Sequence, residues 1–186
     1  MTTAASPHTR VAVLVGSLRT DSVNRRIAES LRDQAPEGVE VQIIDGLGAL
    51  PFYNEDIDGA DVPAPAADLR AAVSGADRVL AITPEYNGTM PAVLNNAIDW
   101  LSRPYGQGAI SGKPFAVVGA TPTPYGGKWA HEDARRSAGV AGAVVLDGIA
   151  VSQTTIDTDV LGDPQVFGRL QDALRALVDH AVVDAA

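Results

Sequence analysis

Runs of consecutive apolar residues alternate along this chain with segments whose apolar residues recur every three or four positions. The runs are rich in Val, Ile, Leu and Ala and are typical of strands buried on both faces. They cover residues 10–17, 39–44, 78–83, 114–120 and 143–146, the last with a possible continuation to Val151. We therefore expect five strands.

Between these runs, the spacing of apolar residues predicts helices. Val23, Ile27 and Leu31 recur at every fourth position, which places them on one face of a helix. The same kind of spacing predicts further helices at 66–74, 91–101, 130–137 and from 164 to about 178. Asp163 and Pro164 are the residue types that cap and begin a helix, so the last helix has the clearest start.

This alternation of strands and helices, repeated five times, predicts a parallel sheet with helices on both faces. For 186 residues we expect one domain, a doubly wound five-stranded sheet in the flavodoxin-like order 2-1-3-4-5. Residues 1–9 are expected to form a disordered tail, and residues 10–186 the single domain.

One connection is longer than a compact domain needs. It covers residues 45–65 and contains the segment LPFYNEDID, with Phe52 and Tyr53. Loops of this length in compact domains are commonly functional or part of an interface. We expect a contact with a neighbouring subunit, and a mobile lid is the alternative.

Composition and charge narrow the possible functions. The chain has 14 basic and 23 acidic residues, a net charge of −9, which disfavours nucleic-acid and anionic-membrane partners. With no cysteine, it has no disulfide, thiolate metal site or cysteine nucleophile. No secretory signal or membrane span is recognisable, so a cytoplasmic protein is expected.

The histidines show no metal-ligand spacing. His8, His131 and His180 lie far apart in the chain, and no metal site is predicted from them. His131 is followed by Glu132 and Asp133, and we expect these three residues to form a solvated first turn of helix.

In an open α/β sheet, ligands bind beyond the carboxyl ends of the strands, and the loop after the first strand has a composition suited to phosphate. A helix N-terminus, hydroxyl groups and an arginine all stabilise a phosphate group. The loop offers Ser17, Arg19, Thr20, Ser22 and Asn24. The alternative is that Ser22 or Asp21 simply caps the following helix.

The loops after the third and fourth strands are also unusual. Thr83–Pro91 can present backbone N–H groups, the Tyr86 ring and the Asn87 amide to a flat heteroaromatic ligand. Ala120–Gly127 ends in two glycines that permit close approach of the backbone to a ligand. Ordinary proline- and glycine-rich turns remain the alternative for each loop alone.

Two of these loops belong to longer motifs. GSLRTDSVNR (16–25) and TPEYNGTMPAVLNNAIDWLSR (83–103) closely resemble signature segments of the NADPH-dependent FMN reductase family, and LPFYNEDID matches its long loop. The resemblance covers essentially the whole chain. Relatives usually carry a serine and an additional glycine where this chain has Thr121–Pro124, and Asn95 replaces a common lysine.

The resemblance implies a set of site residues. The phosphate of FMN would be held by the first loop, its ring by the second, and the third loop would close the site. The implied cofactor-binding residues are Ser17, Arg19, Ser22, Val23, Asn24, Pro84, Glu85, Tyr86, Asn87, Gly126 and Gly127. Tyr53 and Arg103 are candidates for contact with NAD(P)H or substrate, with an ion pair as the alternative for Arg103.

The resemblance also implies the activity. FMN would accept a hydride from NADPH or NADH and pass electrons to a small acceptor, such as a quinone, free flavin, azo dye or metal oxyanion. No catalytic side chain and no metal is nominated, and a homodimer or homotetramer is expected. The alternatives are a flavodoxin-like electron carrier without NAD(P)H activity, or a relative that has lost its cofactor. The first loop lacks the phosphate-loop pattern typical of flavodoxins, which favours the enzyme.

Overall fold

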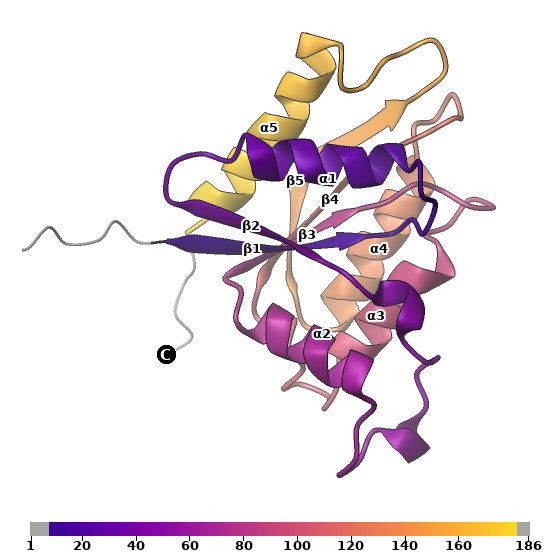
Figure 1. The fold of residues 1–186 in the computed structure, drawn as a ribbon, viewed down its shortest axis with the longest axis vertical. Helices are drawn as coiled ribbons and strands as arrows, with labels where there is room; N and C mark the ends of the chain where they lie inside the picture. Colours follow the sequence, from indigo (N-terminus) through magenta and orange to yellow (C-terminus); the bar gives the residue numbers. More distant parts are fainter. Residues whose placement is uncertain (1–7, 182–186) are drawn as a thin grey trace, which may run out of the picture.

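Five strands form one parallel sheet in this computed structural model, which describes residues 8–181. The strands are β1 (Thr9–Val15), β2 (Val39–Ile44), β3 (Arg78–Ile82), β4 (Pro114–Thr121) and β5 (Val144–Thr154). Their order across the sheet is β2-β1-β3-β4-β5 (Figure 1). The doubly wound, flavodoxin-like arrangement that the sequence predicts is therefore confirmed.

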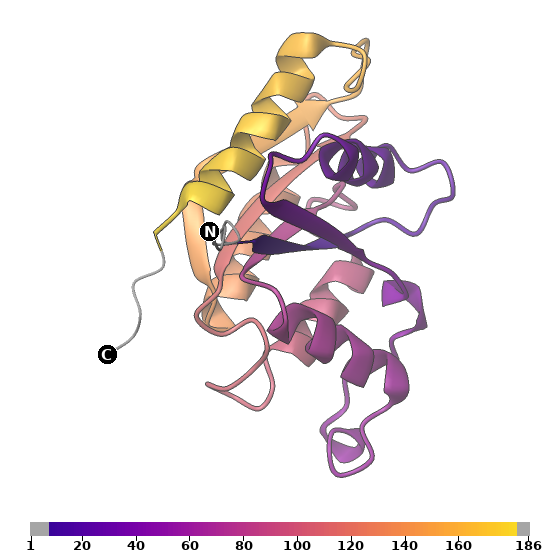
Figure 2. The same ribbon diagram turned by 60° about the vertical axis from the view of Figure 1, so that its left-hand side comes forward.

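Helices cover both faces of the sheet. They are α1 (Val23–Asp33), α2 (Ala64–Ser74), α3 (Ala92–Leu101), α4 (Lys128–Val140) and α5 (Pro164–Asp179). Figure 1 shows α1 and α5 on one face and α2, α3 and α4 on the other. Figure 2 shows α5 lying beside β5, at the end of the sheet opposite β2. The sheet is thus the middle of three layers.

Successive side chains of each strand point to opposite faces of the sheet, so the apolar core has two parts, one on each face. On β1, Val11 and Val13 pack toward α1 and α5, whereas Ala12 and Leu14 pack toward α2, α3 and α4. All four are completely buried. A strand covered on both faces has no exposed position, which explains why the sequence shows a continuous apolar run rather than an alternating one.

Several elements begin or end at residues other than those expected. Strand β1 begins at Thr9, inside the predicted tail, while residues 1–7 of that tail lie outside the described part of the chain. Strand β5 continues to Thr154, which confirms the possible continuation and ends three residues beyond Val151. Its pairing with β4 shifts register between Phe115 and Val117. An edge strand tolerates such a bulge, so the exposed Asp147 and Gly148 interrupt the apolar run without ending the strand.

The long connection between β2 and α2 is fastened to α3. It contains two short 3₁₀ helices, η1 (Leu47–Ala49) and η2 (Glu55–Ile57). The carbonyl of Pro51 accepts hydrogen bonds from Asn96 Nδ2, at 3.0 Å, and Trp100 Nε1, at 2.8 Å. The backbone N–H of Tyr53 donates to Asn96 Oδ1 at 2.8 Å.

Further along, the same connection is fastened to α2. Asp58 forms a bidentate ion pair with Arg70, at 2.6 and 2.7 Å, and both side chains are mostly buried. Arg70 Nε also donates to the carbonyl of Trp100 at 2.9 Å. Anchoring at both places argues against the mobile-lid alternative for this segment.

The first turn of α4 is not solvated as expected. The side chain of His131 is completely buried, whereas Lys128 and Glu132 are exposed and form an ion pair at 3.9 Å. Ala134 and Ala138 are also buried, and they share a helix face with His131 at spacings of three and seven residues. The expectation is wrong for His131, whose side chain faces the core together with Ala134 and Ala138, whereas Glu132 is exposed as expected.

Within the described residues, no helix combines the length and apolar character required to cross a membrane. In the same part of the chain, no group of three or more His, Asp or Glu side chains is placed to hold a metal ion.

Close packing at the ends of the strands leaves no room for a side chain at Gly119. A Cβ on Gly119 would lie 2.2 Å from the carbonyl oxygen of Thr83, whereas a Cβ on Gly168 in α5 would meet no atom within 4 Å. We expect Gly119→Ala to lower the free energy of unfolding by about 1–3 kcal/mol. Gly168→Ala should raise it by about 0.5–1 kcal/mol, because alanine favours a helix. Urea unfolding measures both, and equal midpoints for wild type and Gly119→Ala would contradict the packing described.

Burial of His131 predicts a pH dependence of stability. Burial lowers the pKa of His131 to about 4, the hydrogen bond from the ring to Thr83 partly opposes this shift, and the Arg135 guanidinium adds to it. The unfolded chain binds the proton near pH 6.5, so the free energy of unfolding should fall as pH drops from about 6.5 to about 4.

The histidine alone should contribute about 3 kcal/mol to that loss, converted from the difference between the two pKa values. Urea unfolding of wild type and His131→Gln across this pH range isolates the contribution, since all other groups are common to both proteins. Parallel pH profiles would show that His131 is not held neutral.

Candidate functional site

Three strands come very close together where they end. The backbone N–H of Gly16, after β1, donates to the carbonyl of Ile82 at 2.9 Å, and Thr83 N–H donates to Val118 O at 3.0 Å. A Cβ on Gly16 would lie 2.2 Å from Thr83 Oγ1, as close as one on Gly119 would lie to Thr83 O. Thr83 is therefore enclosed between two glycines, and the loops that follow diverge from this point.

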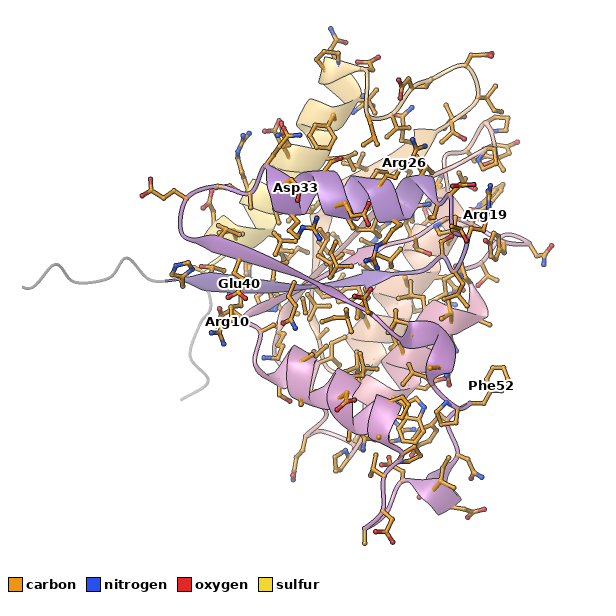
Figure 3. All side chains as sticks on the ribbon, in the orientation of Figure 1. Arg10, Arg19, Arg26, Asp33, Glu40 and Phe52 are labelled. Carbon is orange, nitrogen blue, oxygen red and sulfur yellow. The ribbon has the colours of Figure 1, made fainter. Side chains whose placement is uncertain are left out.

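The loop after β1 borders a cavity of about 410 Å³. Ser17, Leu18, Arg19 and Thr20 form one wall, and the segment after β2 forms another. Arg19 is exposed and lies at the edge where β1 ends (Figure 3). Helix α1 begins just beyond, so its free N–H groups and the guanidinium offer donors to an anion from the same side.

A second arginine of this cavity is already paired. Arg25 forms ion pairs with Glu29, at 2.9 Å, and Asp45, at 2.6 Å. These carboxylates offset its charge locally. No ion pair involving Arg19 occurs among residues 8–181, so Arg19 is the cationic side chain best placed to meet a phosphate there.

Three residues expected to hold the phosphate make contacts within the protein. Ser22 is buried and caps α1, accepting from Arg25 N–H at 3.2 Å, and Val23 packs against the core. Asn24 is buried as well and bonds both backbone groups of Ala120, at 2.8 and 2.9 Å. The capping alternative for Ser22 thus describes its contacts, and phosphate binding by these three residues stays a prediction.

The loop after β3 contains a tight hairpin turn. Tyr86 and Thr89 exchange backbone hydrogen bonds at 3.0 and 3.1 Å, with Asn87 and Gly88 between them. Both central residues have positive φ, 54° and 75°, which is the geometry that an Asn-Gly pair favours. The turn leaves the Tyr86 ring and the Asn87 side chain exposed, while Pro84 is buried beneath them.

Glu85 joins this loop to α4. Its Oε2 accepts from the backbone N–H groups of Trp129, at 3.1 Å, and Ala130, at 3.3 Å. The residue at the N-cap of α4 is Gly127, which has no side chain to perform this role. Glu85 supplies the missing cap from a distant part of the chain, a function that sequence reasoning did not foresee.

The paired glycines of the loop after β4 are required by the protein itself. Gly126 and Gly127 both have positive φ, 63° and 91°. A Cβ on Gly126 would lie 2.5 Å from Ser152 O, and one on Gly127 would lie 3.1 Å from His131 Nε2. These contacts account for the glycines without a ligand, so their role toward a cofactor stays a prediction.

One side chain of this loop is unsatisfied. The hydroxyl oxygen of Thr123 is buried and has no hydrogen-bond partner among the described residues. A buried polar atom normally has a hydrogen-bond partner in the protein, a ligand or an ordered water, so this hydroxyl is free to bond a ligand or a water. Thr123 is not among the predicted site residues, although it lies in the Thr121–Pro124 stretch where this chain departs from its relatives.

Tyr53 and Arg103 lie together. The Arg103 guanidinium is 5.4 Å from the centre of the Tyr53 ring, which packs edge-on against Trp100 at 5.0 Å. Arg103 follows the carboxyl end of α3, and the ten residues of that helix separate it from Pro91 by ~15 Å. Among the residues of the three loops, Met90 borders the same cleft as Arg103, and the role of the pair toward NAD(P)H stays a prediction.

We call the side of the sheet where the parallel strands end the carboxyl edge. The hydrogen-bond donors that the loops place there fit FMN. Ser17, Arg19 and Thr20 match a phosphate, and the exposed turn at 86–87 and the unsatisfied Thr123 hydroxyl match a polar ring system. The three loops also meet around Thr83 in one edge of the sheet. This is the ligand position that doubly wound sheets share.

Known proteins resemble the chain at several levels. It is 47% identical over 127 residues to a quinone reductase of Pseudomonas putida, with 68% of each chain covered. It is 45% identical over 112 residues to a 2-hydroxy-1,4-benzoquinone reductase of a Burkholderia species, with 60% of each covered. The solved structure of FerB, a flavoenzyme NAD(P)H:(acceptor) oxidoreductase from Paracoccus denitrificans, superimposes with a TM-score of 0.81, at 35% identity, covering 92% of this chain and 96% of that one.

Residues 9–156 match the family model described as NADPH-dependent FMN reductase. This match spans β1 to the end of β5 and includes the three loops of the candidate site. Together with the sheet order and the donor set, it confirms the resemblance seen in the sequence motifs. The chain therefore belongs to the NADPH-dependent FMN reductase family, oxidoreductases that use FMN and NAD(P)H.

Proposed function

We propose that this protein is an NAD(P)H-dependent flavin oxidoreductase that binds FMN at the carboxyl edge of its sheet and passes electrons to a quinone. The observation that carries the proposal is the group of aromatic side chains exposed on two loops of that edge and on the first turn of α4. Tyr86, Tyr125 and Trp129 are 47%, 58% and 43% exposed, beside the unsatisfied Thr123 hydroxyl. They offer an open, apolar surface on which flat aromatic molecules can stack.

Residues of three loops would hold the cofactor. Arg19, with Ser17, Thr20 and the start of α1, would bind the phosphate. The turn at Tyr86 and Asn87 and the Thr123 hydroxyl would contact the ring, so that the ring lies between the loops after β3 and β4. When bound, FMN supplies the chemistry, because it accepts a hydride from a nicotinamide and gives up two electrons to an acceptor.

The protein's own contribution is positioning and access. Glu85 fastens the loop after β3 to the first turn of α4, and Asn24 fastens α1 to β4. Fixed loops lower the entropy lost on binding and hold donors where charge develops. No side chain is assigned as a proton donor or base, and the exposed edge lets donor and acceptor reach the same place in turn.

A quinone is the acceptor that the relatives' names and the site chemistry support together. The two relatives from Pseudomonas putida and Burkholderia are quinone reductases by name. In this chain, the Tyr125 and Trp129 rings lie side by side, with their centres 4.6 Å apart and their planes tilted by 46°, and both are exposed. Such a surface favours a planar, neutral ring over a metal oxyanion, whose charge the net −9 of the chain also repels.

A direct experiment tests the proposal. Protein is reconstituted with FMN, and its visible spectrum is followed anaerobically as NADPH or NADH is added, and then benzoquinone. Bleaching of the flavin by a nicotinamide and recovery of its colour by the quinone are expected. Bleaching by dithionite alone would contradict the enzyme and favour the electron carrier, and failure to bind FMN would favour a relative without cofactor.

We also propose that the protein is cytoplasmic and assembles as a homodimer or homotetramer. A cleft of about 440 Å³ between α3 and α4 supports the assembly. Its rim carries Tyr105 and Val140, which are 83% and 76% exposed, and its walls carry both acidic and basic residues, Asp99 and Arg136 among them. Two copies of this face can bury the apolar rim and pair opposite charges.

Removing the guanidinium of Arg19 tests the phosphate assignment. Arg19→Ala should weaken FMN binding about tenfold or more, because a charge-assisted hydrogen bond is lost. Thermal unfolding of the protein without FMN should be unchanged, since Arg19 is exposed. Arg26→Ala is the matched control, because it removes the same charge from the exposed side of α1 (Figure 3). Calorimetric titration with FMN compares them, and equal affinities for the two variants would refute the assignment.

A charge on the rim of the α3–α4 cleft should break the assembly. Val140→Asp places a carboxylate in the apolar contact, which costs free energy on burial. Light scattering after gel filtration should show a lower mass than for wild type. Ile156→Asp, at an exposed apolar residue outside the cleft, should leave the mass unchanged. A monomeric wild type, or an unchanged mass for Val140→Asp, would overturn the proposed assembly.

A further inference from the structure

The hydrogen-bond ladder between β3 and β4 stops at Thr83. The register pairs Ile82 with Val118, and Thr83 N–H still donates to Val118 O at 3.0 Å. In a regular parallel ladder the Thr83 carbonyl would then accept from Ala120 N–H. That N–H donates instead to Asn24 Oδ1, at 2.9 Å. The Thr83 carbonyl thus loses its strand partner inside the protein.

His131 takes the place of the missing partner. Its Nε2 lies 3.0 Å from Thr83 O, and its Nδ1 lies 2.7 Å from Ser152 Oγ. A carbonyl oxygen only accepts hydrogen bonds, so Nε2 carries the proton and Nδ1 accepts from the Ser152 hydroxyl. The ring is completely buried, and both of its nitrogens are satisfied.

The ring is uncharged in this arrangement. Burial lowers the pKa of His131 to about 4, and the neighbouring Arg135 guanidinium also disfavours a positive ring. Arg135 is paired with Asp147 at 3.8 Å, on β5. At neutral pH the imidazole therefore acts as a fixed donor to Thr83 and a fixed acceptor from Ser152, with no role for a change of charge.

The bond controls the direction in which the chain leaves β3. The Thr83 carbonyl belongs to the peptide that leads into Pro84, and Thr83 Oγ1 donates to the Pro84 carbonyl at 3.0 Å. On the other side, Gly119 makes room for the Thr83 carbonyl, since a Cβ at that position would lie 2.2 Å from the carbonyl oxygen. Holding this carbonyl therefore fixes the start of the loop that presents Tyr86 and Asn87.

We propose that His131 is a positioning residue for the loop 83–91, and that its hydrogen bond to the Thr83 carbonyl holds this loop in the conformation that binds the flavin ring. The claim that this loop binds the flavin ring rests on the proposed function. The claim that His131 holds the loop in one conformation is independent of it and applies with no cofactor present. His131 touches neither cofactor nor substrate in this scheme and acts through Thr83.

Two substitutions separate the two bonds of the ring. In His131→Gln, the amide nitrogen reaches the position of Nε2 and can still donate to Thr83. In His131→Asn, the shorter amide reaches only the position of Nδ1, so it keeps Ser152 and leaves the Thr83 carbonyl unpaired. Both variants are polar and uncharged. Leu174→Ala, in the core beneath α5, is the control for lost stability because it lies in the core on the opposite face of the sheet from α4.

The first measurement uses the protein without FMN. Hydrogen–deuterium exchange followed by mass spectrometry reports the protection of peptides that contain residues 83–91. We expect exchange about tenfold or more faster than wild type in His131→Asn, because a buried carbonyl has lost its donor. His131→Gln and Leu174→Ala should exchange within about threefold of wild type. Equal exchange in the Asn and Gln variants would overturn the positioning role.

The second measurement is calorimetric titration with FMN. His131→Asn should bind about tenfold or more weakly than wild type, whereas His131→Gln should bind within about threefold. If exchange in the loop is faster in His131→Asn but FMN affinity is unchanged, His131 positions the loop but the loop does not contribute to FMN binding. That result would overturn the claim that the held conformation binds the flavin ring. If wild type binds no FMN, the proposed function fails, while the exchange result still decides the role of His131.

Discussion

The crowding of β1, β3 and β4 around Thr83 is the constraint on which the rest of this structure depends. Two glycines, Gly16 and Gly119, leave no side-chain volume on either side of it, so the strands end close together. Two buried side chains, Asn24 and His131, then take over hydrogen bonds that a continued ladder would have made. The three strands are hydrogen-bonded to one another up to Thr83. Beyond it their loops diverge, and the candidate site lies between these loops.

The loops at that opening are held by side chains from distant elements. Glu85 caps α4 from the loop after β3, and the long connection after β2 is fastened to α3 through Pro51. A family of oxidoreductases whose chemistry resides in FMN needs little else from its protein. The protein has to keep donors in place, leave an aromatic surface exposed and let two substrates reach it in succession.

The sequence carried enough information for the architecture because buried parallel strands and amphipathic helices leave strong local patterns. It also directed attention to three loops that the structure places at one edge of the sheet, through hydroxyls, glycines and Arg19 after the strands. What it could not show is which polar residues turn inward. Asn24, Glu85 and His131 bond backbone groups far away in the chain, and only the folded arrangement reveals those partners. Thr123 can be recognised only in the folded structure, where its buried hydroxyl has no hydrogen-bond partner among the described residues.

The two tryptophans of the chain occupy contrasting environments, and this gives the protein a pair of built-in optical reporters. Trp100 is completely buried in the core between α2 and α3, whereas Trp129 is 43% exposed at the start of α4, beside the candidate site. Emission from Trp100 reports the intact core. Emission from Trp129 lies at longer wavelength in water and is open to energy transfer to a yellow chromophore at the carboxyl edge. The unmodified chain thus carries one indole that senses the integrity of the core and one that senses the solvent at the edge of the candidate site.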